Sequence, residues 1–212
     1  MSPHAVSAAA AMTTAPGRRA LQAKLVPLLA IPLLLILAAN PALAHHMEGG
    51  RLPTTYLGGL LSGIAHPVIG PDHLVFLLAI GLAGSRSPGR WVPALVACGL
   101  GGSLLGLAWP ALPWIEPLVA LSLVAAGLVA LGKLPRPLML PLIGCHGAAL
   151  AGVMVGAEPT PLLAYLLGLG LVQTTLLLAG LALFRVLKRG HRPLAGAVIG
   201  MGLISTLALA LA

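Results

Sequence analysis

The stretch Gly63-Ile64-Ala65-His66-Pro67-Val68-Ile69-Gly70-Pro71-Asp72-His73 lies inside an apolar run from Leu57 to Gly84. Asp72 is one of only four acidic residues in the chain, and His66 and His73 are two of its seven histidines. Ionisable side chains within a membrane are costly, so their presence indicates a functional site. The two prolines and Gly70 favour a break in the helix. Irregular backbone at membrane depth must be enclosed by protein or line a wet cavity.

The composition predicts an all-α polytopic membrane protein. The chain has 212 residues, of which 58% are hydrophobic and only 8% are charged. A soluble protein of this length could not bury so much apolar surface. The net charge of +8 comes from short basic clusters between apolar runs, where such residues orient membrane proteins. We therefore expect the lipid bilayer as a partner and no nucleic acid.

Residues 1–44 have the pattern of a cleaved signal peptide. Basic residues between Arg18 and Lys24 precede the apolar region Leu25–Ala39, and Ala42-Leu43-Ala44 is a small-x-small cleavage site. Ordinary secretory export fits better than twin-arginine export. The alternative is an uncleaved first helix, which two prolines in the apolar region disfavour.

Residues 45–56 would form a periplasmic tail after cleavage. His45, His46, Met47 and Glu48 follow the cleavage site directly. Together with a free amine they offer imidazole, thioether and carboxylate ligands for a borderline divalent metal. The alternative is a solvated terminus without a ligand role.

Residues 57–212 form the predicted six-helix transmembrane domain. Basic residues follow the first, third and fifth apolar runs, whereas the loops after the second and fourth runs contain no Lys or Arg. This positive-inside pattern predicts six crossings with both ends outside the cytoplasmic membrane. The first run, 28 residues long, then counts as one helix broken around Pro67–Pro71. The six runs are 57–84, 91–109, 114–132, 137–156, 160–187 and 193–212.

The candidate metal site combines residues from two of these runs. His66, Asp72 and His73 suit a borderline divalent ion such as nickel, cobalt, zinc or copper, although Asp72 could instead orient one histidine. An unbroken helix would hold positions six or seven apart about 10 Å from each other, so the break is needed to bring them together. Cys145 and His146 lie halfway along the fourth run, which allows a shared midplane site.

Two further patterns concern helix packing. Gln173, Thr174 and Thr175 form a polar step in the fifth run, for which hydrogen bonding between helices is the preferred interpretation. Glycines four residues apart let helix backbones approach closely. Such pairs occur at Gly59 and Gly63, Gly102 and Gly106, Gly152 and Gly156, and Gly196 and Gly200.

These residues resemble the HupE/UreJ family of nickel and cobalt permeases. The segment from His66 to His73 has the pattern His-Pro-x-x-Gly-x-Asp-His, which looks like the family's first signature. The second signature, Phe-His-Gly-x-Ala-x-Glu, is matched in part by Cys145–Ala151. His146, Gly147 and Ala149 agree, whereas Cys145 replaces Phe and Ala151 replaces Glu. The missing Glu removes one expected acidic ligand.

The resemblance implies a transporter rather than an enzyme, with Ni²⁺ or Co²⁺ as the substrate and no permanently bound cofactor. It also implies supply of metal to hydrogenase or urease, through their metallochaperones as partners, and leaves a homo-oligomer open. The expected metal ligands are His66, Asp72, His73, His146, His45, His46 and Cys145.

Two other functions compete with transport. A membrane cytochrome could use the same histidines as haem ligands, and a Soret band would reveal it. A membrane metalloenzyme is the second alternative, but the chain has no His-Glu-x-x-His motif.

Overall fold

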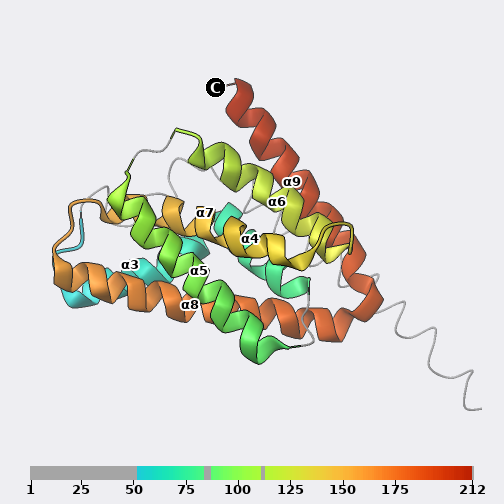
Figure 1. Ribbon diagram of the computed structural model, residues 1–212, viewed down its shortest axis with the longest axis horizontal. Coiled ribbons are helices and arrows are strands. Elements are labelled where there is room, and N and C mark those ends of the chain that lie inside the picture. Colours follow the sequence, from blue (N-terminus) through green and yellow to red (C-terminus); the bar gives the residue numbers. More distant parts are fainter. Residues whose placement is uncertain (1–51, 84–86, 111–112, 212) are drawn as a thin grey trace, which may run out of the picture.

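The computed structural model describes residues 52–83, 87–110 and 113–211. Over these residues the chain forms seven α-helices and short 3₁₀ turns (Figure 1). The six predicted apolar runs are all helical, and the first is divided into two helices. The helices are α3 (Tyr56–Ile69), α4 (Pro71–Leu82), α5 (Pro88–Ala108), α6 (Ile115–Ala130), α7 (Met139–Ala151), α8 (Pro159–Leu187) and α9 (Arg192–Leu211).

Length and composition make this a polytopic membrane protein, but they do not support all six predicted crossings. Four helical segments are long and apolar enough to cross a bilayer, and the α3–α4 pair is a fifth if it counts as one bent span. Helix α6 has 16 residues, about 24 Å at 1.5 Å per residue, which is shorter than the roughly 30 Å of hydrocarbon. The predicted signal peptide and the His45–His46 tail lie outside the described residues.

The helix break lies at Gly70, inside the predicted interval. Thr55 caps α3 because its hydroxyl accepts a hydrogen bond from the Gly58 N–H at 3.0 Å. Pro67 remains within α3, whereas Pro71 occupies the first turn of α4, where a missing N–H costs nothing. The two helix axes are bent by 78°. The bend places His66 on one helix and Asp72 and His73 on the next.

The helices pack in pairs. Helices α3 and α4 both lie along α8, α5 packs on α7, and α6 packs on α9, which leans away from α8 toward the C-terminus (Figure 1). Two of the four predicted glycine pairs are at such contacts: Gly59 and Gly63 lie against the α8 backbone, and Gly102 and Gly106 against the α7 backbone. A Cβ at the other two pairs would meet no close neighbour, so they are not packing seams.

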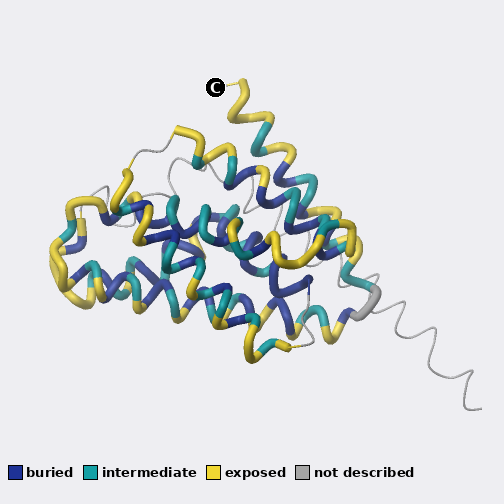
Figure 2. Tube along the Cα trace, in the orientation of Figure 1, coloured by how far each residue is buried: buried dark blue, intermediate teal, exposed yellow. Residues whose placement is uncertain are grey.

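Figure 2 shows where buried residues lie along the chain, and these include polar as well as apolar side chains. One apolar cluster joins α4, α5, α6 and α9 with parts of α7 and α8, and a smaller one joins α7 and α8. Buried polar side chains need hydrogen-bond partners or a functional reason to be there. They are His66, His73, Ser103, Ser122, His146 and Gln173.

Candidate metal centre

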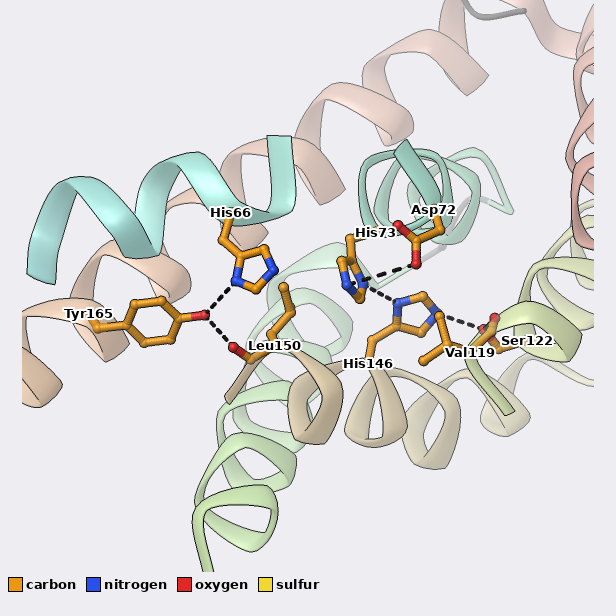
Figure 3. A network of polar contacts seen from close by, with 8 residues as sticks. All are labelled: His66, Asp72, His73, Val119, Ser122, His146, Leu150 and Tyr165. Carbon is orange, nitrogen blue, oxygen red and sulfur yellow. Dashed lines mark hydrogen bonds and ion pairs between the residues drawn. The ribbon is translucent and has the colours of Figure 1, made fainter. Parts of the chain in front are cut away.

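Two histidines from different helices meet in the interior. His73, in the first turn of α4, and His146, in the middle of α7, are 3% and 1% exposed. Their Nδ1 atoms are 2.9 Å apart (Figure 3). Phe76, one turn beyond His73, stacks on the His146 ring with the ring centroids 3.6 Å apart and the planes 9° from parallel. The stacking and the short contact fix the His146 ring from two sides.

The hydroxyl of Ser122 on α6 determines which His146 nitrogen carries a hydrogen. Its single hydrogen is donated to the Val119 carbonyl oxygen at 2.7 Å, because that oxygen can only accept. The hydroxyl oxygen therefore accepts from His146 Nε2, which is 2.6 Å away. In the neutral ring, His146 Nδ1 then keeps its lone pair and accepts from the Nδ1–H of His73.

His66 is held by a second arrangement of the same kind. Tyr165 on α8 donates its hydroxyl hydrogen to the Leu150 carbonyl oxygen at 2.6 Å. Its oxygen consequently accepts from His66 Nδ1, at 3.3 Å (Figure 3). This hydrogen on Nδ1 leaves the lone pair of a neutral His66 ring on Nε2. The His66 and His73 rings lie edge to face with their centroids 5.8 Å apart.

Asp72 faces the outer nitrogen of His73. The Asp72 Oδ2 to His73 Nε2 distance is 3.8 Å, and the Asp72 side chain is 27% exposed, in contrast to the buried histidines. Asp72 is also in the first turn of α4, where a helix favours negative charge. Gly70 leaves the room for this arrangement, because a Cβ there would be 2.8 Å from His73 Cδ2 and 3.3 Å from Asp72 Oδ1.

The structure brings His66, Asp72, His73 and His146 into one region but leaves Cys145 apart. Cys145 lines an apolar groove of about 660 Å³ between α5 and α7, together with Cys98. Ala151, at the position of the missing glutamate, is buried and offers no ligand atom. Among the described residues, no three His, Cys, Asp or Glu side chains converge closely enough to hold a metal ion. The two imidazoles and the carboxylate thus form a chain of contacts and not a closed cage.

Sequence reasoning missed the partners of the histidines. Ser122, Tyr165 and Phe76 each touch an imidazole, yet Ser122 and Tyr165 lie in runs without a candidate ligand and Phe76 looked like an ordinary apolar residue. One signal was present for Tyr165, since it is one of only two tyrosines and lies inside an apolar run. Serine in a membrane helix carries no comparable signal, because it also bonds readily to its own backbone.

Comparison with known proteins identifies the family of the chain. Residues 33–211 match the family model described as HupE / UreJ protein. The chain is 30% identical over 184 residues to protein HupE of Rhizobium leguminosarum bv. viciae, an alignment that covers 77% of this chain and 93% of the relative. No solved structure matches the chain. The chain therefore belongs to the HupE/UreJ family, whose members are generally associated with nickel and cobalt transport.

Proposed function

We propose that the protein is a permease that carries a divalent transition-metal cation, Ni²⁺ first and Co²⁺ second, into the cytoplasm. The observation that supports this most is the approach of His73 Nδ1 to His146 Nδ1, 2.9 Å apart in the buried interior. Imidazole nitrogens suit these borderline ions. Family membership supports the same class of substrate.

The spacing of the two nitrogens suits a shared cation. Two imidazole nitrogens at 2.0–2.1 Å from one metal and at right angles to each other are roughly 3 Å apart. The two Nδ1 atoms could therefore become neighbouring ligands once the rings turn so that both lone pairs point to the cation. Water molecules and His66 would complete the coordination. A site with few protein ligands binds its cation modestly, which favours release on the far side.

The Nε2 atoms of His73 and His146, which would not bind the metal, have partners of the kind found beside metal-bound histidines. Metal-bound histidines usually donate their second N–H to a carboxylate, a carbonyl or a hydroxyl. His146 Nε2 has Ser122, and His73 Nε2 faces Asp72. Cation entry would move the His73 hydrogen from Nδ1 to Nε2, so the ring changes tautomer without losing a proton. Asp72 is then an orienting carboxylate, the second of the two roles that its sequence position allowed.

The bend at Gly70 provides a mechanism for access. His66 belongs to α3, whereas Asp72 and His73 belong to α4, so a change of the 78° angle changes the distance between the His66 and His73 rings. Transporters commonly place such sites at broken helices near the bilayer midplane. We infer that movement at the bend joins His66 to the His73–His146 pair on one side of the membrane and separates it on the other.

The proposed topology has six crossings in the inner membrane, with the short α6 included and the mature N-terminus outside. The loop charges support this orientation. A divalent cation that moves inward across about 100 mV gains about 4.6 kcal/mol. That is sufficient for roughly a thousandfold accumulation without ATP. Metallochaperones of hydrogenase or urease would receive the cation.

A haem cytochrome is less consistent with this geometry. Haem ligation by two histidines needs the porphyrin plane between their rings. His73 and His146 are in direct contact, and Phe76 covers the His146 face. No residue set in the described helices suggests a hydrolytic enzyme either, since the polar cluster contains no nucleophile beyond the hydrogen-bonded Ser122 and Tyr165.

Metal flux into proteoliposomes tests the proposal. With a negative interior potential, the wild-type protein should take up Ni²⁺ and Co²⁺ in preference to Zn²⁺ and Cu²⁺. Loss of the hydrogen-bond partner of a metal ligand costs up to roughly 100-fold. His146→Ala and His73→Ala remove a ligand itself, so each should reduce uptake by more than this. His191→Gln is the matched control, because His191 bonds the Ala130 carbonyl oxygen at the end of α6 and lies edge to face with the Phe184 ring. Absence of flux in the wild type, or normal flux in both His→Ala proteins, would refute the proposal.

A further inference from the structure

Gln173 is a buried amide without a hydrogen-bond partner. Its side chain, in the middle of α8, is 0% exposed. Neither Nε2 nor Oε1 has a hydrogen-bond partner among the described residues. A buried amide that bonds to nothing is destabilising, and more so in a membrane protein. Such a group needs an explanation, and a transient polar ligand is one of the few available.

The neighbouring threonines do not form hydrogen bonds between helices in which Gln173 could take part. Thr174 donates to the Gly170 carbonyl oxygen at 2.7 Å, and Thr175 donates to that of Leu171 at 2.9 Å. Both bonds are within α8. The sequence-based interpretation of this polar step as a hydrogen-bonded link between helices is therefore wrong for all three residues.

Contacts along α8 place Gln173 between the part that packs on α3 and the part that packs on α4. One turn before it, Leu169 lies against Gly63 of α3, and one turn after it, Leu177 lies against Gly81 of α4. Gln173 therefore lies between the contacts that α8 makes with the two helices that meet at the bend. The same buried side of α8 carries Tyr165, the partner of His66.

A glycine on α5 makes room for the carboxamide. A Cβ on Gly99 of α5 would be 2.7 Å from Gln173 Oε1 and 3.0 Å from its Nε2. The Gly99 carbonyl oxygen in turn packs against Gly147, the residue after His146. Ser103 fixes this junction, because its hydroxyl is 3.0 Å from the Gly147 carbonyl oxygen and 3.3 Å from that of Gly99.

We propose that Gln173, which packs against Gly99 of α5, is a further cation-contacting position on the transport path; this rests on the proposed function. Its Oε1 accepts hydrogen bonds from the water shell of a divalent cation or contacts the cation itself, and its NH₂ group holds an accompanying water. The amide is neutral, so it lowers the cost of partial dehydration without trapping the ion. The position is enclosed in this conformation and becomes accessible when the bend at Gly70 moves.

The test replaces the carboxamide by an apolar side chain of similar length, Gln173→Met. A merely buried, unsatisfied amide predicts a higher melting temperature and unchanged uptake. The proposed role predicts that Ni²⁺ uptake into proteoliposomes falls roughly tenfold, the loss expected for about 1.4 kcal/mol of polar interaction, while the melting temperature is unchanged or higher. Thr175→Val on the same helix is the matched control, because its hydroxyl serves only its own backbone.

A second variant keeps the test decisive if Gln173→Met does not reach the membrane. Gly99→Ala displaces the carboxamide without removing it and should also lower uptake roughly tenfold. Gly101→Ala is its control, since a Cβ there meets nothing within 4 Å. Wild-type uptake by Gln173→Met, or by Gly99→Ala where Gln173→Met is not inserted, overturns the inference. Absence of uptake in the wild type would instead refute the permease assignment.

Discussion

His146 and Gln173 are equally buried on packed helices, yet their surroundings differ completely. His146 has a partner at each ring nitrogen and an aromatic ring on its face. Gln173 has a glycine beside it and no hydrogen bond among the described residues. The first environment holds a ligand atom in a fixed direction, and the second leaves an amide able to turn. The difference suggests that His146 binds the cation, whereas Gln173 contacts it only during its passage along the same path.

Removal of the Ser122 hydroxyl should leave a polar atom of His146 without its partner, as in Gln173. Its effect on metal binding should be larger than the effect of removing the Tyr165 hydroxyl. Ser122→Ala leaves His146 Nε2 without its acceptor, so the ring can change tautomer or orientation. Loss of an outer partner of this kind typically lowers metal affinity by roughly 10–100-fold. Competition titration of the purified protein with a chromophoric Ni²⁺ chelator would measure it.

Thr206→Val is the control for this measurement, because its hydroxyl bonds the Gly202 carbonyl oxygen within α9. Equal Ni²⁺ affinities for Ser122→Ala and the wild type would show that the Ser122 contact does not position His146.

Removal of the Tyr165 hydroxyl should have a smaller effect, because it acts on His66 and not on the central pair. Tyr165→Phe loses the bonds of the hydroxyl to the Leu150 carbonyl oxygen and to His66 Nδ1, and only the second, a neutral hydrogen bond worth about 0.5–1.5 kcal/mol, positions His66. Ni²⁺ uptake should therefore fall by between about two- and tenfold. Initial rates in proteoliposomes would show it. Tyr56→Phe serves as the control, since Tyr56 is 52% exposed. A loss of uptake as large as that of His146→Ala would contradict the expectation that His66 contributes less than the His73–His146 pair.

The sequence was sufficient to predict the helices and the break. Apolar runs between basic clusters matched the observed helices closely, because hydropathy dominates the local signal in a membrane protein. Pro71 and Gly70 identified the break, although Pro67 stays helical within the last turn of α3. The number of crossings was less predictable, since α6 is mostly apolar but ends after 16 residues.

The site was predictable as a set of histidines but not as a set of contacts. The approach of His73 to His146, 73 positions apart, depends on how α4 and α7 pack, and no local pattern encodes it. Ser122 was missed for the same reason, and Tyr165 had only the weak signal of a rare tyrosine inside an apolar run. Adjacency in sequence to His146 suggested a shared ligand role for Cys145, but neighbouring residues on a helix point in different directions, and Cys145 lines the α5–α7 groove.

X-ray absorption spectroscopy at the nickel edge of the Ni²⁺-loaded protein tests the central claim most directly. The account predicts at least two imidazole ligands in the wild type, one fewer in His146→Ala, and an unchanged imidazole count in His191→Gln. An imidazole signal that is the same in the wild type and in His146→Ala would contradict the proposal that the His73–His146 pair holds the cation.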